Sequence, residues 1–251
     1  MAGTALQRRL IWRTGQVVET VDETPQVRTL VLSVPGWPGH RAGQHVDVRL
    51  TADDGYQAER SYSIASAPGA DERLALTIER LDDGEVSPYL TGELRVSDQL
   101  ELRGPIGGYF VWDVPLGGPL LLVAGGSGIC PLMAMLRLRQ RAGSTVPARL
   151  LYSSRSLADV IYGAELDALV ATHSGLEVVH TLTRAHPEGW GGFQRRIDTE
   201  MLRAVAWQPG ERPLIFVCGP TPLVESVADA LVNLGHEPAR IKTERFGPTG
   251  G

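Results

Sequence analysis

Residues 120–135, Leu-Leu-Leu-Val-Ala-Gly-Gly-Ser-Gly-Ile-Cys-Pro-Leu-Met-Ala-Met, constrain the fold of this chain more than any other stretch. Residues 120–123 are an apolar run typical of a strand buried on both faces of a parallel sheet. Gly125, Gly126 and Gly128 then remove side chains where the backbone turns sharply and approaches another group closely. The apolar residues that follow have the pattern of a helix. The stretch therefore predicts a buried strand, a glycine turn and a helix.

The turn itself, Gly125-Gly126-Ser127-Gly128, leaves two interpretations open. A glycine turn at a helix N-terminus points free N–H groups and the positive end of the helix dipole at one spot, which suits a phosphate or pyrophosphate. The same residues also make an ordinary strand-to-helix turn without a ligand, because a glycine-rich turn alone is a weak signal. The turn is not the G-x-S-x-G elbow of esterases, because Ile129 stands where the second glycine is needed.

Composition argues against several classes of protein. The formal net charge is −5 and no segment is strongly basic, so we expect no nucleic-acid partner. No apolar run is long enough to span a bilayer, and the first residues lack the apolar core of a leader peptide. We therefore expect a cytoplasmic protein that does not insert into a membrane.

Cys130 and Cys218 are the only cysteines, which argues against a disulfide framework. Two thiols also cannot hold an iron–sulfur cluster, which ordinarily takes four protein ligands. We interpret Cys130 as a small packed hydrophobe. The six histidines lack the regular spacing of a metal site, so we expect no metal ligands among His40, His45, His173, His180, His186 and His236.

The first hundred residues consist of short segments of β-branched and apolar residues separated by Gly, Pro and Asp turns. Six such strands predict a small antiparallel barrel. One short helix is expected at residues 87–94, with Ser87 as its cap and Pro88 in its first turn. The expected strands are residues 12–21, 27–34, 45–50, 60–66, 74–81 and 99–103.

After residue 115 the pattern changes to alternating strands and helices, which predicts a parallel sheet with helices on both faces. We therefore expect two domains, 1–114 and 115–251. Ligands on such sheets bind past the carboxyl ends of the strands, and polar or glycine turns stand there at residues 125–128, 153–156 and 218–220. The expected strands are residues 120–124, 148–153, 176–182, 214–218 and 240–246, and the helices are residues 130–141, 159–171, 198–206 and 221–234.

Arg60, Tyr62 and Ser63 combine a fixed cation, an aromatic plane and a hydroxyl on one expected strand. Arginine holds phosphate, tyrosine covers a flat ring, and serine hydrogen-bonds a ring nitrogen or carbonyl. The alternative is that Tyr62 fills the core and Arg60 is a surface charge.

Gly84, Val86 and Ser87 mark a second turn into a helix and hence a second candidate phosphate site. Three residues of the preceding strand, Thr77, Ile78 and Arg80, are expected beside it. An ordinary capped helix without a ligand is the alternative here.

Five motifs taken together resemble the ferredoxin–NADP reductase superfamily. They cover nearly the whole chain, from Trp12 to Phe246, in the family's order. Each motif is modest alone, and the five in register are specific. They are Arg60-x-Tyr62-Ser63, Gly84-x-Val86-Ser87, Gly104-Pro105-x-Gly107-x-x-Phe110, Gly125-Gly126-Ser127-Gly128-Ile129-x-Pro131 and Cys218-Gly219-Pro220.

The resemblance implies an FAD-binding barrel whose flavin takes a hydride from a nicotinamide dinucleotide. On the matching positions, Arg60 would contact the flavin pyrophosphate, Tyr62 would stack on the isoalloxazine, and Ser63 would hydrogen-bond near N5. Glu244 and Phe246 match an acid and an aromatic that the family places at the flavin from its last strand.

The resemblance also implies roles for the three turns. The turn of Gly84, Val86 and Ser87 would hold the FAD phosphates. Cys218 would lie near the nicotinamide C4. The dinucleotide itself would be held by Gly125, Gly126, Ser127, Gly128, Gly219 and Pro220.

Residues 153–156 bear on the choice of dinucleotide. Ser154 and Arg155 resemble the stretch where NADPH-using relatives hold the adenosine 2′-phosphate, and an arginine beside hydroxyls suits a dianionic phosphate. Users of NADH tend to place an acid there instead. We therefore expect FAD and NADPH as cofactors, with NADH as an alternative to NADPH.

The sequence favours an FAD-dependent NADPH oxidoreductase with Ser63, Cys218 and Glu244 at the reacting centre. No ferredoxin module is recognisable in the chain, so we expect electrons to leave to a separate ferredoxin, flavodoxin or partner oxidoreductase. One alternative is a reductase of free flavin or small oxidants. A second is a non-catalytic subunit that binds flavin or nucleotide.

Overall fold

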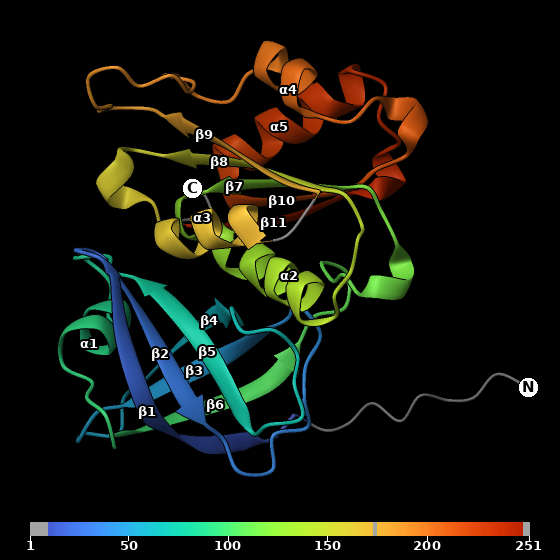
Figure 1. Ribbon diagram of the computed structural model, residues 1–251. Coiled ribbons are helices and arrows are strands. Elements are labelled where there is room, and N and C mark those ends of the chain that lie inside the picture. The colour runs from blue at the N-terminus through green and yellow to red at the C-terminus, as the bar shows by residue number, and fades with distance from the viewer. Residues whose placement is uncertain (1–9, 173–174, 248–251) are drawn as a thin grey trace, which may run out of the picture.

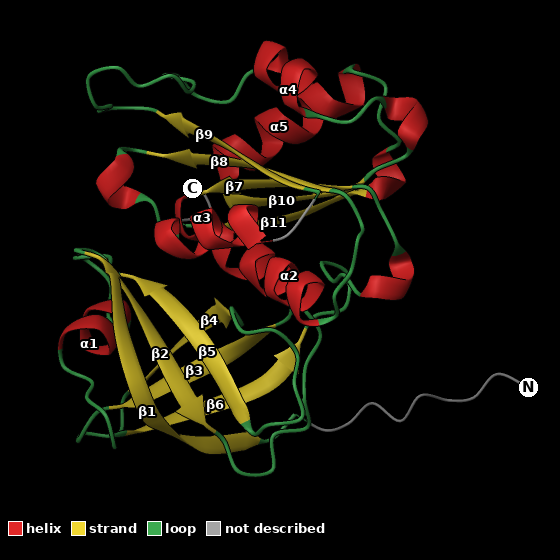
Figure 2. Ribbon diagram, in the orientation of Figure 1, coloured by secondary structure: helices red, strands yellow, loops and turns green. Residues whose placement is uncertain are grey.

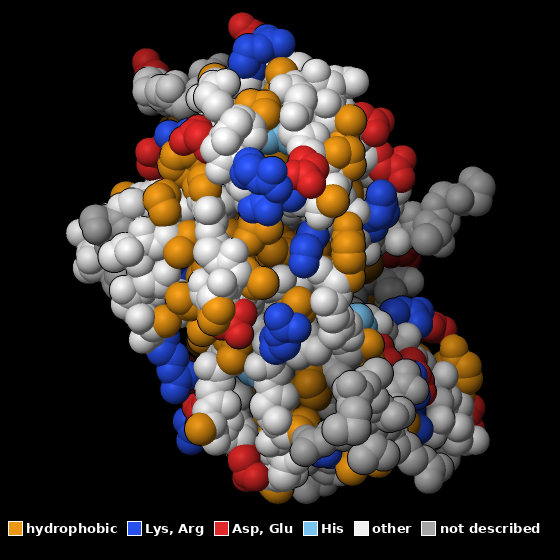
Figure 3. Space-filling view, turned by 90° about the vertical axis from the view of Figure 1, so that its right-hand side faces the viewer, with side chains coloured by type: hydrophobic (Ala, Val, Ile, Leu, Met, Phe, Trp, Pro, Cys, Tyr) orange, Lys and Arg blue, Asp and Glu red, His pale blue; other side chains and the backbone are white. Residues whose placement is uncertain are grey.

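Strands and one short helix build the first half of the molecule, whereas strands and helices alternate in the second (Figures 1 and 2). The computed structural model describes residues 10–172 and 175–247. In this part of the chain, no helix is long and apolar enough to cross a bilayer. On the face drawn in Figure 3, Lys and Arg side chains lie in separate small groups between acidic and apolar ones.

The first half is an antiparallel six-stranded sheet with the order β4-β3-β6-β1-β2-β5. Its two edge strands meet where Ile64, just after β4, forms an antiparallel bridge with Leu76 of β5, so the sheet closes on itself. The predicted barrel is therefore confirmed. Its strands are β1 (Trp12–Thr24), β2 (Val27–Ser33), β3 (His45–Thr51), β4 (Gln57–Ser63), β5 (Arg73–Glu79) and β6 (Gln99–Ile106).

The fourth strand differs from the expected residues 60–66, because it begins at Gln57 and ends at Ser63. After Ser63 the chain exchanges one partner strand for another. The N–H of Ile64 donates to the carbonyl of Gln44, and the next N–H, that of Ala65, donates to Ala75 of β5. This change of partners ends the regular pairing of β3 with β4 and closes the barrel.

The short helix α1 spans Ser87–Gly92, two residues less than expected, and Ser87 is not its cap. Val86 occupies the N-cap position and no side chain caps the helix. The hydroxyl of Ser87 accepts a hydrogen bond from the N–H of Leu81 at 3.0 Å instead. It thereby stabilises the turn that precedes the helix.

The second half is a parallel sheet in the order β11-β10-β7-β8-β9 with helices on both faces, as predicted. Alternate residues of each strand serve opposite faces, since Leu120 and Leu122 pack with α2 and α3 whereas Leu121 and Val123 pack with α4 and α5. The elements are β7 (Leu120–Gly125), α2 (Ile129–Arg141), β8 (Ala148–Ser154), α3 (Gly163–Thr172), β9 (Leu176–Leu182), α4 (Thr199–Val205), β10 (Leu214–Pro220), α5 (Thr221–Asn233) and β11 (Ile241–Phe246).

Helix α3 begins at Gly163, four residues later than expected. Leu157–Asp159 forms a separate 3₁₀ turn, η3, and Tyr162 takes a left-handed backbone conformation with φ 61°. A tyrosine rarely adopts this conformation, so packing must hold it there. The predicted boundary between residues 114 and 115 stays a prediction, and the 3₁₀ turn η1 (Val114–Leu116) lies across it.

Arg137 of α2 connects three parts of the molecule. Its guanidinium donates to the carbonyl of Ala65 in the barrel half at 2.8 Å and makes two hydrogen bonds to Glu165 of α3, at 2.8 and 2.6 Å. It also lies 4.8 Å from the ring centre of Tyr162. This one side chain therefore ties the barrel to the two helices that face it.

We expect Arg137→Ala to lower the free energy of unfolding by about 1–2 kcal/mol, because it removes charged hydrogen bonds and leaves Glu165 unpaired in a partly buried place. Arg141→Ala is the matched control. Arg141 lies one turn further along α2 and donates to the carbonyl of Pro68 at 3.2 Å. Urea denaturation measures both variants, and an equal loss in the two would show that the Arg137 contacts add nothing specific.

Candidate functional site

Two of the predicted residues meet although they lie 181 positions apart. The hydroxyl of Ser63, at the end of β4, donates a hydrogen bond to Glu244 Oε1 of β11 at 3.2 Å. β4 belongs to the barrel and β11 to the parallel sheet, so this contact joins the two halves. It brings together the residues that were expected at the flavin from opposite ends of the chain.

Glu244 and Cys218 occupy paired positions on neighbouring parallel strands. Burial raises the pKa of Glu244 to about 7, and the hydrogen bond from Ser63 lowers it less. Burial, followed by the nearby Glu244, raises the pKa of the Cys218 thiol well above its ordinary value. Near neutral pH, Cys218 is therefore a neutral thiol, and Glu244 exchanges a proton.

Arg60 and the Gly84 turn are also brought together, through a residue that the sequence analysis did not single out. The guanidinium of Arg60 pairs with Glu85 Oε2 at 3.0 Å and donates to the carbonyl of Glu59 at 2.7 Å. The hydroxyl of Tyr56 donates to Glu85 Oε1 at 2.9 Å. Glu85 lies within the predicted turn, and this position is the sequence feature that could have identified it as a site residue.

Tyr62 lies beside this cluster on β4 and is partly buried against the barrel core. Burial raises the pKa of its hydroxyl to about 12, and Arg60 acts in the opposite direction. Tyr62 is therefore a neutral phenol whose ring is only partly covered by protein. Such a ring has an apolar face left for a flat ligand.

Thr77 and Ile78 of β5, and Arg80 just after it, were expected beside the Gly84 turn. Arg80 lies near the helix that follows this turn, since a Cβ at Gly92 would be 3.8 Å from its Nη1. Ile78 points into the barrel core, and Arg80 pairs with Asp82 at 3.0 Å. Thr77 faces the other half, where Tyr162 donates to its hydroxyl. The alternation of side chains along a strand sends them to different environments.

The glycine turn has the close approach that its composition predicts. It begins where β7 ends, forms the 3₁₀ turn η2 (Gly126–Gly128) and runs directly into α2. A Cβ at Gly128 would collide with the carbonyl of Cys218, and Gly126 has φ 54°. The side chain of Ser127 donates to Glu79 Oε2 of β5 at 2.7 Å. The glycines therefore let the turn pack against the ends of two other strands.

The second strand-end turn, Cys218-Gly219-Pro220, touches the glycine turn. A Cβ at Gly219 would lie 3.2 Å from the N atom of Gly125. Pro220 pairs with Phe246, which is partly buried against the core shared with α2. The last two predicted motifs thus form one surface at the carboxyl edge of the sheet.

Ser154, at the end of β8, is 5% exposed, and within the described residues its Oγ makes no hydrogen bond of ordinary geometry, although it lies near the hydroxyl of Tyr152. Arg155 follows it and is exposed. The carbonyl of Arg155 accepts from the N–H groups of Arg184 and Ala185 at 2.9 and 3.1 Å. Arg184, two residues after β9, is thus a second cation beside Arg155, and the sequence analysis missed it.

Cys130 lies in the seam between the halves, with its thiol 3.7 Å from the carbonyl of Thr77. Burial raises its pKa to about 12. The interpretation as a small packed hydrophobe therefore fits its surroundings.

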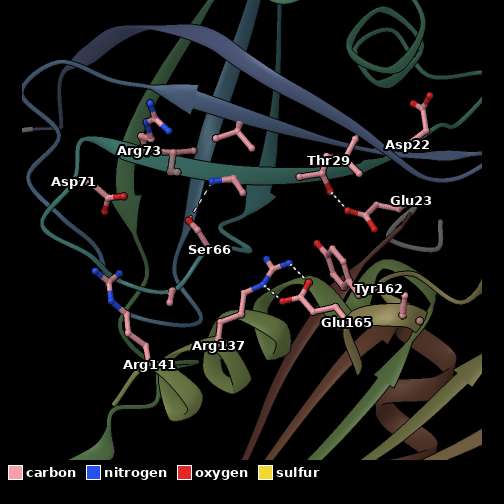
Figure 4. Close-up of a pocket in the computed structure, with 17 residues that line it drawn as sticks. Asp22, Glu23, Thr29, Ser66, Asp71, Arg73, Arg137, Arg141, Tyr162 and Glu165 are labelled. Atoms are coloured by element: carbon pink, nitrogen blue, oxygen red, sulfur yellow. Dashed lines mark hydrogen bonds and ion pairs between the residues drawn. The ribbon is translucent and has the colours of Figure 1, made fainter. Parts of the chain in front are cut away.

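A groove of about 720 Å³ runs along this seam (Figure 4), and neither Arg60 nor Tyr62 lines it. In Figure 4, Arg137 and Glu165 face each other across its floor, and Tyr162 points toward Thr29 of the barrel. None of the predicted cofactor residues lines it. We therefore assign the candidate site to the surface around Ser63 and Glu244, and the groove to the contact between the halves.

The raised pKa of Glu244 gives a testable dependence of stability on pH. Between its ordinary value of 4.5 and about 7, the unfolded chain is ionised while the folded protein keeps the proton. The free energy of unfolding therefore falls as pH rises through this range. Glu244→Gln, which cannot ionise, removes this part of the slope, and urea denaturation across the range measures it.

Glu225→Gln is the control, since Glu225 is an exposed glutamate paired with Arg245 at 3.5 Å. It is expected to follow the wild type. If the free energy of unfolding changed with pH equally in wild type and Glu244→Gln, the pKa of Glu244 would not be raised by folding.

Comparison with known proteins agrees with this geometry. Residues 14–111 match the oxidoreductase FAD-binding domain, and residues 122–229 match the oxidoreductase NAD-binding domain. The FAD/NAD-binding domain of nitric oxide dioxygenase from Vibrio cholerae superposes with a TM-score of 0.83 at 25% identity, covering 94% of this chain and 99% of that one.

Among curated relatives, the glycine betaine monooxygenase reductase subunit of Pseudomonas aeruginosa is 32% identical over 95% of this chain, which spans 66% of that relative's length. Ferredoxin–NADP reductase B of Sorangium cellulosum is 34% identical over 82% of this chain and 84% of its own length. The expected cofactor classes and family are thereby confirmed. The chain belongs to the ferredoxin–NADP reductase family, with an FAD-binding domain followed by an NAD-binding domain.

Proposed function

We propose that this protein is an FAD-dependent NADPH oxidoreductase that delivers electrons to a separate redox partner. The observation that carries the proposal is the contact of Ser63 with Glu244, which joins the two domains at one point beside Cys218. A reaction between a flavin and a nicotinamide needs such a junction, because positioning the two rings supplies most of the catalysis.

The residues present fit both groups. Tyr62 offers a partly covered ring, and the exposed Arg60 offers a cation that FAD phosphate would take over from Glu85. The glycine turn and the Ser87 turn provide backbone close to a helix start. Ser154 keeps a buried hydroxyl without a hydrogen bond of ordinary geometry in the described residues, as a site that awaits a ligand would.

Three side chains of the protein, those of Ser63, Glu244 and Cys218, lie where this reaction is proposed to take place. FAD held at this point would supply hydride acceptance from the reduced nicotinamide and one-electron transfer to the partner. Ser63 holds a hydrogen bond at this point, and Glu244, with its pKa raised to about 7, holds or releases a proton there. Cys218 contributes a small neutral thiol that adds no charge.

NADPH is the proposed substrate because two exposed arginines, Arg155 and Arg184, are joined by a backbone hydrogen bond directly after Ser154. Asp159, an acid near this turn, already accepts a hydrogen bond from Ser156 at 2.6 Å. The positive charges of the two arginines favour the extra phosphate of NADPH over the ribose hydroxyls of NADH.

The acceptor that we propose is a small redox protein or a partner oxygenase, since relatives are named as reductase subunits or components of monooxygenases. We also propose a cytoplasmic location, where thiols stay reduced. The two cysteines, both buried and unpaired, support it.

Anaerobic titration of the FAD-loaded protein tests the function. NADPH is expected to bleach the flavin absorbance at lower concentration than NADH. Ferredoxins, flavodoxins and free flavins added afterwards identify the acceptor class by reoxidation. Failure of both nucleotides to bleach the flavin would leave only a subunit that binds cofactors without turnover.

We expect Arg155→Ala to weaken NADPH binding about tenfold or more and to leave NADH nearly unchanged, because one charged phosphate contact is lost. Arg203→Ala, which removes an exposed arginine from α4, is the control. Stopped-flow reduction at varied nucleotide concentration measures both constants. Equal weakening of NADPH and NADH would remove the proposed phosphate role.

A further inference from the structure

The barrel domain places a carboxylate against the glycine turn of the other domain. Ser127 Oγ donates to Glu79 Oε2 at 2.7 Å, and the same oxygen is 3.8 Å from the position that a Cβ of Gly126 would take. Glu79 is the last residue of β5, whereas Gly126 and Ser127 lie between β7 and α2. A negative group of the FAD-binding domain therefore lies at the turn assigned to the dinucleotide.

Buried contacts of strand β5 fix its position relative to the glycine turn. Thr77 lies two residues before Glu79 and so on the same face of the strand. Its hydroxyl hydrogen-bonds with Tyr162 and, at 2.7 Å, with Thr29, and it is 5% exposed. Moving the strand would break these buried contacts, so the backbone of β5 keeps Glu79 next to the turn.

The turn already favours an anion. Helix α2 has 13 residues, and its free N–H groups and dipole give positive potential at its start. In the structure, Glu79 supplies a negative charge at this place. A dinucleotide brings its pyrophosphate to the same turn, and two like charges in one site oppose each other.

Building on the proposed function, we propose that Glu79 lowers the affinity for the dinucleotide through repulsion of the pyrophosphate. The pyrophosphate is common to NADPH, NADH and their oxidised forms, so the effect is the same for all four. This separates Glu79 from Arg155, whose expected effect is confined to the 2′-phosphate. Weaker binding of the oxidised form also speeds its release.

The test uses the FAD-loaded protein and calorimetric binding of NADP⁺ and NAD⁺ at several salt concentrations. Glu79→Gln keeps an oxygen that accepts from Ser127 but removes the charge. It is expected to bind both nucleotides about fivefold to tenfold more tightly at low salt, and the gain is expected to shrink as salt screens it.

Two further variants separate charge from structure. Glu72→Gln removes another barrel carboxylate, one that accepts from the N–H of Gly36, and is expected to leave both affinities unchanged. Ser127→Ala removes the hydrogen-bond donor but leaves the charge, so it is expected to bring no gain. Equal FAD content in all variants, read from the absorbance, shows that the flavin site is intact.

Unchanged or weaker nucleotide binding by Glu79→Gln overturns the inference. If the wild type binds neither nucleotide, the proposed function fails, and inorganic pyrophosphate becomes the probe. Tighter pyrophosphate binding by Glu79→Gln than by the wild type would then still support repulsion at the turn. Equal binding would reject it.

Discussion

The whole arrangement depends on strand β5 being buried on both faces. Leu74, Leu76 and Ile78 point into the barrel core, whereas Ala75 and Thr77 are buried on the opposite face, where Tyr162 of the NAD-binding domain donates to Thr77. A strand shared in this way cannot shift relative to either domain without exposing apolar surface or breaking buried hydrogen bonds. It therefore holds the glycine turn and the end of β4 in a fixed relation.

Carboxylates mark three places on this framework where cofactor-binding residues are proposed. Glu85 pairs with Arg60, Glu79 accepts from Ser127, and Glu244 accepts from Ser63. The three differ in environment. The side chains of Arg60 and Glu85 are each about half exposed, so replacing Glu85 by a phosphate as the partner of Arg60 costs little free energy. Glu244, in contrast, is partly buried and its pKa is raised.

Local sequence rules predicted most of the fold, since strands and turns follow from alternation and from Gly, Pro and Asp breakers. They were wrong where a residue had a partner outside its own helix or strand. Ser87 looked like a helix cap, yet its hydroxyl accepts from Leu81 in the preceding turn. Helix α3 was expected too early, because the pattern gives no sign that Tyr162 would turn left-handed to reach Thr77.

For the candidate site too, the sequence predicted some features and not others. The types of residue, their order and the family resemblance were available from the sequence, and they were enough to name FAD and a nicotinamide dinucleotide. Thr77 and Ile78 were expected beside the same turn, but Ile78 points into the barrel core and Thr77 meets Tyr162. Glu79 and Arg184 carried no local signal, because a single charged residue after a strand is common.

The sequence by itself determined a barrel followed by a wound parallel sheet, and glycine turns where strands end, because these depend on short-range patterns. Only the tertiary structure decided that Ser63 would meet Glu244, that Thr77 would face Tyr162 and that Glu79 would lie at the glycine turn. The physical reason is that burial, charge and hydrogen bonding at these residues come from segments far away in the chain, which the packing of the two domains brings together.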